Sequence, residues 1–167
     1  MFTDLFSLKG RVALVTGGSR GIGRMIAAGF LSQGAAKGYI TARKAAACEA
    51  TAKELSEAYT GECIALPIDI STMTGIEMLA TEIKKREAKL DILVNNAGAA
   101  WGAEFDEFPE SGWDKVMTLN VKAPFFLTKA LAGPLRAAGS AQQPAKVINI
   151  ASIDGIFVNP LETYSYA

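Results

Sequence analysis

The sequence predicts an α/β fold in three layers, with a doubly wound parallel sheet between two layers of helices. Short apolar runs typical of strands alternate with longer segments of helical periodicity along the chain. The first turn from strand to helix is rich in glycine, so the two elements can meet closely there. A chain of 167 residues has the size of one domain, and we expect a single domain over residues 1–167.

Five strands are expected, over residues 11–17, 37–42, 63–69, 90–98 and 145–152. The first, RVALVTG, is an apolar run that ends in glycine, which is typical of a buried parallel strand. Alternation with helices predicts right-handed crossovers between parallel neighbours. Gly38 is unusual in the second strand, because glycine weakens a strand and the sequence suggests no functional reason for it.

Four helices are expected between these strands. The first, second and fourth cover residues 21–33, 43–59 and 112–137, and the third ends at about residue 89. Gly34 follows the first helix directly and is a typical C-terminal cap. Ser71 and Thr74 are both candidate N-terminal caps for the third helix. Capping-box spacing occurs in Thr74–Glu77 and in Ser111–Asp114, ahead of the long fourth helix.

Composition excludes several classes of function. Seventeen basic residues balance seventeen acidic ones, so no overall charge would attract nucleic acid or an anionic membrane. The absence of histidine excludes a histidine-based triad, and the two cysteines, Cys48 and Cys63, have no zinc-site spacing. No apolar stretch has the length of a membrane span, and the amino terminus does not resemble a signal peptide. We expect a cytoplasmic protein with two reduced, buried or half-buried thiols, a disulfide being the alternative.

The stretch TGGSRGIG, residues 16–23, joins the first strand to the first helix. Gly17, Gly21 and Gly23 carry no side chains, so backbone amides there would come close to a pyrophosphate. The amino end of the following helix adds a partial positive charge. This strand–turn–helix context favours nucleotide binding over the alternative of a tight turn without a ligand.

The charges near this turn favour NADP over NAD. A site for NAD usually places a carboxylate about 20 residues beyond the turn, on the ribose 2′-hydroxyl. Residues 24–48 contain no Asp or Glu, whereas Arg43 and Lys44 end the second strand and Arg20 lies in the turn. A guanidinium is suited to bidentate contact with a 2′-phosphate. The alternative is that these cations are only solvated surface charges.

With these motifs, the sequence resembles the short-chain dehydrogenase/reductase family over its whole length. The matching motifs are TGGSRGIG (16–23), Asp69 after the third strand, NNAG (95–98) after the fourth, Asn120 in the long helix, and Ser152 with Tyr166. Stretches such as LDILVNNAGAAWGA are also similar to bacterial β-ketoacyl (3-oxoacyl-ACP) reductases of the type associated with rhamnolipid synthesis. The resemblance implies a Rossmann-type fold, of which five of the usual seven strands are present.

The resemblance implies a cofactor site that comprises Gly17, Ser19, Arg20, Gly21, Ile22, Gly23, Arg43, Asp69, Ile70, Asn95, Ala97 and Gly98. In the family, Asp69 and Ile70 would border the adenine, while Asn95, Ala97 and Gly98 would wall the cofactor channel. Asn95 would also stabilise the central strand. Asp69 has a simpler alternative role as a cap for the next helix, and Asn95 with Asn96 as turn residues.

The resemblance also implies three catalytic residues, Asn120, Ser152 and Tyr166. Asparagine is a poor helix former, so Asn120 in an apolar helix either satisfies backbone groups or serves a site. In the family it opens the helix locally and holds a water. Ser152 has the alternative of being an ordinary residue at a strand end. Tyr164 competes with Tyr166, which we prefer because it begins a run resembling the family's YAxSK.

We therefore expect an oxidoreductase that uses NADP to interconvert a carbonyl and a secondary alcohol, a 3-oxoacyl thioester being one candidate substrate. A catalytically inactive regulatory or scaffold protein of the same fold is the alternative. The family lysine would lie four residues after Tyr166, so we expect the sequence to be part of a longer protein, inactive without the remainder. Strand 145–152 would then have an unpaired edge. The resemblance implies a homodimer or homotetramer.

Overall fold

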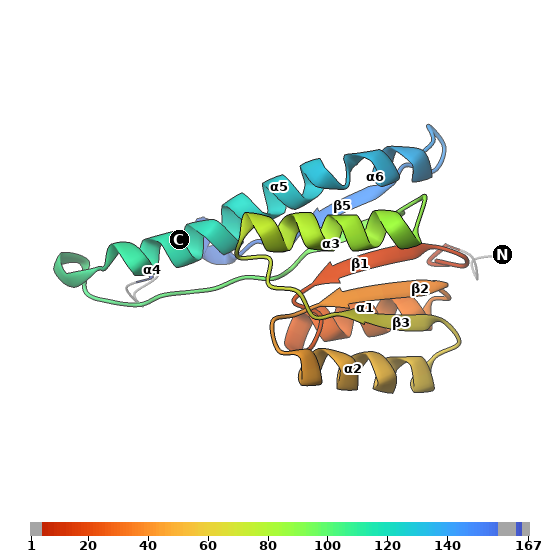
Figure 1. The fold of residues 1–167 in the computed structure, drawn as a ribbon, viewed down its shortest axis with the longest axis horizontal. Coiled ribbons are helices and arrows are strands. Elements are labelled where there is room, and N and C mark those ends of the chain that lie inside the picture. The colour runs from red at the N-terminus through yellow and green to blue at the C-terminus, as the bar shows by residue number, and fades with distance from the viewer. Residues whose placement is uncertain (1–4, 157–162, 165–167) are drawn as a thin grey trace.

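The structure, a computed structural model, describes residues 5–156 and 163–164. Its strands are β1 (Val12–Thr16), β2 (Lys37–Thr41), β3 (Glu62–Leu66), β4 (Ile92–Asn95) and β5 (Lys146–Asn149). They form one parallel sheet in the order β3-β2-β1-β4-β5, with β1 at its centre (Figure 1). The predicted doubly wound sheet is confirmed, because the chain moves outward from β1 in one direction and then in the other.

Helices cover both faces of the sheet and complete the three predicted layers (Figure 1). One face carries α1 (Gly21–Ser32) and α2 (Ala45–Ala58), and the other carries α3 (Met73–Arg86), α5 (Ala123–Ala130) and α6 (Ala132–Ala138). Alternation along β1 divides the core accordingly: Ala13 and Val15 pack with α1 and α2, whereas Leu14 packs with α3 and α5. No helix among the described residues is long and apolar enough to cross a membrane.

The expected long helix over residues 112–137 is several elements in the structure. It begins earlier, with α4 (Glu110–Met117), and passes through a π-helical turn at Thr118–Lys122 before α5 and α6. The π turn confirms the expected local opening around Asn120. Because Pro124 has no N–H to donate one turn back, the regular hydrogen-bond ladder cannot continue through it.

The expected helix caps are partly wrong. Thr72, not Ser71 or Thr74, caps α3, since its hydroxyl accepts a 3.0 Å hydrogen bond from the Gly75 N–H. Pro109 precedes α4 without a side-chain cap, so the Ser111–Asp114 capping box is also wrong. Gly34 behaves as expected, with a φ of 89° directly after α1. Spacing alone does not identify the capping residue, because a shift of one residue in the helix start changes which side chain reaches the free N–H groups.

Strand β5 forms one edge of the described sheet and is exposed along its length. Val147 is 43% exposed and Ile148 is 40% exposed, although both belong to the apolar strand KVIN. The expected unpaired edge is therefore present among the described residues. An exposed apolar edge strand is a site at which other strands can pair.

Gly38 is not required by the space around it. It lies in β2 between Ala13 of β1 and Cys63 of β3, and its backbone φ is not positive. A Cβ added there would meet Leu31 Cδ2 at 3.6 Å, which is an ordinary van der Waals contact. The structure gives no packing reason for this glycine.

Both thiols are free and buried, in agreement with the expectation from the sequence. Burial raises the pKa of the Cys63 thiol to about 12 and also raises the pKa of Cys48. The Cys48 Sγ lies 3.5 Å from the Ile40 carbonyl oxygen, to which it donates. These thiols are core residues between α2 and the sheet and remain protonated.

A partly buried polar contact joins Tyr39 to Glu87, the residue directly after α3. Its hydroxyl donates to Glu87 Oε1 at 2.6 Å, and Lys37 Nζ donates to the same oxygen at 2.6 Å. Burial and the neighbouring carboxylate raise the pKa of Tyr39, so the phenol stays neutral. Burial also raises the pKa of Glu87, but the two donors and the Lys37 charge outweigh it and lower that pKa overall. Tyr39 is a core residue and not an acid–base candidate.

Candidate nucleotide-binding site

The glycine turn after β1 has the backbone that only glycine adopts readily. Gly17 has a φ of 67° and Gly21 a φ of 54°, both in the left-handed region. At Gly23 the reason is close approach, since a Cβ would lie 2.3 Å from the Gly17 carbonyl oxygen. The turn therefore folds tightly onto the start of α1, as a cradle for a phosphate group requires.

Two side chains lock this turn to the end of β4. The Thr16 hydroxyl accepts hydrogen bonds from the backbone N–H groups of Asn96 and Ala97, both at 2.9 Å. In return, Asn96 Nδ2 donates to the carbonyl oxygens of Thr16, at 2.8 Å, and Gly17, at 3.3 Å. The ends of β1 and β4 are thereby held together where the two halves of the sheet diverge.

A cleft of about 600 Å³ opens at this end of the sheet. Its walls come from the glycine turn, the ends of β2 and β3 with the loops after them, and the loop after β4. The lining residues are Gly17, Ser19, Arg20, Gly21, Ile22, Gly23, Thr41, Ala42, Arg43, Lys44, Ala47, Ile68, Asp69, Ile70, Asn96, Ala97, Gly98 and Leu119. Ligands of doubly wound sheets bind in such a crevice, outside the carboxyl ends of the strands.

The cleft brings together every residue expected at the cofactor site except Asn95. Asn95 is buried, and its Nδ2 donates to Asn149 Oδ1 at 2.8 Å and to Thr128 Oγ1 at 3.3 Å. Its amide therefore joins β4 to β5 and α5 and does not face the cleft. Asn95 therefore stabilises the end of β4 against its neighbours, and Asn96, not Asn95, lines the cleft.

Several residues of the cleft were not in the expected set. They are Thr41, Ala42, Ala47, Ile68, Asn96 and Leu119, whereas Lys44 was expected as one of the cations near a 2′-phosphate. Asn96 has a signal in the sequence, since a polar residue after a buried strand that neighbours β1 must lie beside the glycine turn. Ala47 and Leu119 have none, because their positions depend on where α2 and the π turn are packed.

Asp69 lines the cleft and does not cap α3. Its Oδ1 accepts a 2.9 Å hydrogen bond from the Ser71 N–H, and its side chain is exposed. Its backbone is constrained by α3, because a Cβ at Gly75 would lie 1.8 Å from the Asp69 carbonyl oxygen. The simpler alternative of a helix cap is wrong, and the cap is Thr72.

Asn120 holds the loop after β4 from the π turn. Its Oδ1 accepts from the Ala99 N–H at 2.8 Å, and its Nδ2 donates to the Ala99 carbonyl at 2.9 Å. A Cβ at Gly98 would lie 3.4 Å from Asn120 Oδ1, so the amide also borders the cleft wall. The side chain is half-buried and satisfies backbone groups, one of the two roles expected for it.

The remaining expected catalytic residues lie after β5. Ser152 is half-buried and its Oγ accepts a 3.2 Å hydrogen bond from the Asp154 N–H, which begins a short helical turn at Ile153–Gly155. Tyr166 lies outside the described residues. The ring of Tyr164 packs edge-to-face on Phe105 and Phe108, with centroids 5.4 and 5.9 Å away.

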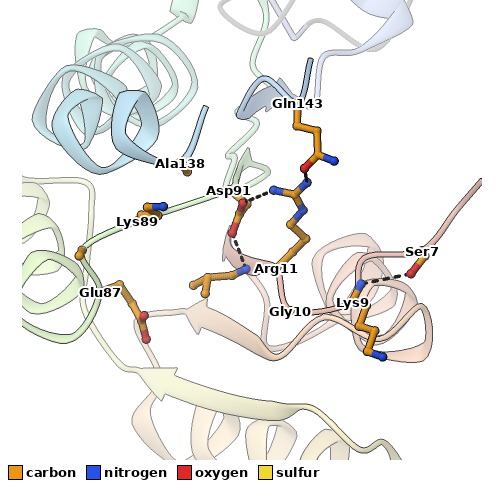
Figure 2. Close-up of a pocket in the computed structure, with 11 residues that line it drawn as sticks. Ser7, Lys9, Gly10, Arg11, Glu87, Lys89, Asp91, Ala138 and Gln143 are labelled. Carbon is orange, nitrogen blue, oxygen red and sulfur yellow. Dashed lines mark hydrogen bonds and ion pairs between the residues drawn. The ribbon is translucent and has the colours of Figure 1, made fainter. Parts of the chain in front are cut away.

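A second hollow, of about 750 Å³, lies at the opposite, amino end of β1 (Figure 2). Arg11 donates there to Asp91 Oδ1 at 2.6 Å and to Gln143 Oε1 at 2.5 Å, and Asp91 Oδ2 accepts from the Val12 N–H. These groups bind one another and join β1, β4 and the loop before β5. These contacts are structural.

Comparison with known proteins agrees with the fold. Residues 11–167 match the model of the short chain dehydrogenase family, and the chain belongs to that family. The chain is 52% identical over 161 residues to the rhamnolipids biosynthesis 3-oxoacyl-[acyl-carrier-protein] reductase of Pseudomonas aeruginosa, covering 96% of this chain and 62% of the relative. It therefore spans less than two thirds of that protein's length.

A solved structure of Pseudomonas aeruginosa RhlG in an active-site complex with NADP superposes with a TM-score of 0.91 at 52% identity, over 96% of this chain and 62% of that one. The NAD-dependent glycerol dehydrogenase of Listeria innocua is 33% identical over 90% of this chain and 56% of the relative. RhlG is solved with NADP, whereas the Listeria innocua relative is named as NAD-dependent. Family membership therefore does not choose between NAD and NADP.

The Thr16 hydroxyl is expected to contribute substantially to stability. Thr16→Val keeps the shape but leaves the N–H groups of the half-buried Asn96 and Ala97 without their acceptor, which should lower the free energy of unfolding by about 2 kcal/mol. Thr16→Ser keeps the acceptor and should cost about 1 kcal/mol or less. Urea denaturation of the two variants measures this difference. Equal stability of the valine and serine variants would contradict the structural role of the hydroxyl.

Proposed function

We propose that the protein is an NADP-dependent oxidoreductase that transfers hydride reversibly between the nicotinamide and a carbonyl or secondary alcohol. The observation that carries the proposal is the charge of the cleft, in which Arg20, Arg43 and Lys44 lie beside the glycine turn. Residues 24–48 contain no carboxylate for a ribose 2′-hydroxyl. Three cations with no competing acid in that segment fit a 2′-phosphate.

The residues of the cleft fit a dinucleotide. The glycine cradle is a space that side chains would fill, as the 2.3 Å approach of a Cβ at Gly23 to Gly17 illustrates. Arg20, the residue before α1, makes no side-chain cap, so the first N–H groups of that helix keep their capacity for a pyrophosphate. Asp69 and Ile70 form the wall on which the adenine would lie, with Asp69 as its hydrogen-bond partner.

The chemistry is assigned to residues around the loop after β4 and the segment after β5. When bound, the nicotinamide would supply or accept the hydride. Tyr166 would donate a proton to the developing alkoxide, and Ser152 would hydrogen-bond the same oxygen. Asn120 would hold Ala99, and with it the loop that borders the nicotinamide side of the cleft.

A lysine four residues after Tyr166 in the full-length protein would lower the pKa of the tyrosine phenol. A cation about 4 Å from the phenol at an effective dielectric constant of about 20 contributes roughly 4 kcal/mol, or about three pKa units. Tyrosinate would then be available near neutral pH for alcohol oxidation. Without the lysine, a phenol with a pKa near 10 would be ionised in roughly one molecule in a thousand at about pH 7.

The 3-oxoacyl thioester is our preferred substrate class. The Pseudomonas aeruginosa relative is named for a 3-oxoacyl-[acyl-carrier-protein], and its sequence is 52% identical to this chain. Apolar side chains near the site support an acyl group: Ile153, directly after Ser152, is 65% exposed, and Phe105, beside Tyr164, is 73% exposed. A non-catalytic nucleotide-binding scaffold is the second candidate, favoured if the full-length protein lacks the lysine.

The cofactor and substrate are tested together with full-length protein. Oxidation of NADPH and NADH is followed spectrophotometrically with ketones, acetoacetyl thioesters and sugars. We expect NADPH and the acetoacetyl thioester to give the highest kcat/KM. Arg43→Ala should raise the KM for NADPH about tenfold or more and leave that for NADH nearly unchanged, because one charge-assisted contact to the 2′-phosphate is lost. Strong preference of the wild-type protein for NADH would overturn the NADP proposal.

The two tyrosines are distinguished by removing one hydroxyl at a time. Tyr166→Phe should lower kcat by a factor of about 100 to 10,000, since it removes the general acid. Tyr164→Phe is the matched control and should stay within a few-fold of wild type, because ring packing on Phe105 and Phe108 does not need the hydroxyl. Cofactor fluorescence titration confirms that both variants still bind NADPH. The opposite order of effects would assign the acid to Tyr164.

We also propose a homodimer or homotetramer formed through the α4–α5 side of the molecule. Trp113, Val121 and Phe125 are 49%, 54% and 63% exposed, and their spacing places them near one face of the helix. Phe125→Glu should therefore shift the full-length protein towards monomer in light scattering. Met78→Glu, at an exposed apolar residue of α3, is the control and should not. A monomeric wild-type protein would contradict the proposal.

A further inference from the structure

Thr51 is a buried polar residue that the expected site did not include. It lies in the middle of α2 and is 7% exposed. A threonine inside a helix usually bonds the carbonyl one turn back. Thr51 instead donates its hydroxyl across to the carbonyl oxygen of Ser19, at 2.9 Å. This is a contact between α2 and the glycine turn.

The contact fixes the peptide that leads into Arg20. The Ser19 carbonyl and the Arg20 N–H belong to one planar trans peptide, in which they point in opposite directions. Holding the Ser19 oxygen on α2 therefore also sets the direction of the Arg20 N–H and the position of the Arg20 Cα. Elsewhere the turn is held by Asn96 at Gly17 and by the Thr41 carbonyl, which accepts from the Gly18 N–H at 3.1 Å.

The same helix also carries the second group of cations. Arg43 and Lys44 precede the first residue of α2 and line the cleft, as does Ala47, which is one turn before Thr51 on the same helix face. Besides apolar packing in the core, an ion pair between Arg24 and Glu54 joins α1 to α2, and its side chains are 39% and 61% exposed. An exposed ion pair fixes little, whereas the Thr51 hydroxyl is a buried polar link from α2 to the glycine turn that contains Arg20.

We propose that Thr51 is a positioning residue for cofactor selectivity: through Ser19 it sets the spacing between Arg20 on one side and Arg43 with Lys44 on the other. That spacing decides how well the cations reach a 2′-phosphate together. The pyrophosphate end of the turn is held separately by Asn96. Loss of the Thr51 hydroxyl therefore weakens NADPH binding more than NADH binding. The inference rests on the proposed NADP-dependent function.

The test uses fluorescence titration of full-length protein with NADPH and with NADH. Thr51→Val is expected to raise the Kd for NADPH about fivefold to tenfold, the equivalent of one net hydrogen bond, and the Kd for NADH less than twofold. In steady-state kinetics the KM for NADPH should rise by a similar factor while kcat at saturating NADPH stays unchanged. Thr51→Ser keeps the hydroxyl and should restore wild-type selectivity.

Ser56→Ala is the matched control on the same helix. Its hydroxyl bonds the backbone of Cys63, away from the glycine turn, so its loss should leave both Kd values within twofold of wild type. If valine is not accommodated at position 51, comparing Thr51→Ala with Thr51→Ser isolates the hydroxyl in the same way. A Kd for NADPH within twofold of wild type, or equal weakening of NADPH and NADH, overturns the inference. Failure of the wild-type protein to bind NADPH overturns the proposed function itself.

Discussion

The candidate site depends on the hydrogen bonds between Thr16 and Asn96. Neighbouring parallel strands β1 and β4 leave the sheet towards helices on opposite faces, so their ends would separate without a link. The Thr16 hydroxyl accepts two backbone N–H groups from the β4 side, and the Asn96 amide returns two bonds to the β1 side. Because Thr16 is only 1% exposed, water cannot replace these bonds. The crevice between the two loops is therefore held open in a defined shape.

Polar contacts also join neighbouring strand ends farther out along the sheet. Thr41 at the end of β2 donates to the Ile68 carbonyl after β3 at 3.0 Å, and its own carbonyl accepts from Gly18 in the glycine turn. Asn95 joins β4 to β5 through Asn149. The cleft is thus built from backbone loops braced by small polar side chains, which fits a site whose ligand needs close approach to backbone amides.

The fold could be predicted from the sequence because its determinants are local. Apolar runs such as VALVT and the glycine spacing after them define a strand, a turn and a helix without tertiary information. Asn120 shows the limit of prediction from local sequence. Its residue type predicted a break in the helix, but not that its amide oxygen and nitrogen both bind Ala99. Thr51 gave no signal at all, because a threonine in a helix is unremarkable until the glycine turn packs against it. Contacts between elements far apart in the chain need the packed fold.

A chain without net charge can still have a locally cationic cleft. The seventeen basic and seventeen acidic residues cancel overall, but not locally. Arg20, Arg43 and Lys44 share the cleft with one carboxylate, Asp69, which accepts a backbone N–H from Ser71. At physiological ionic strength, charges act over about 8 Å, so the local excess of cations decides the field at the cleft and the distant acids do not. In the proposed NADP site, selectivity would then depend on how rigidly the cations are held, which is a property of the glycine turn and α2 together.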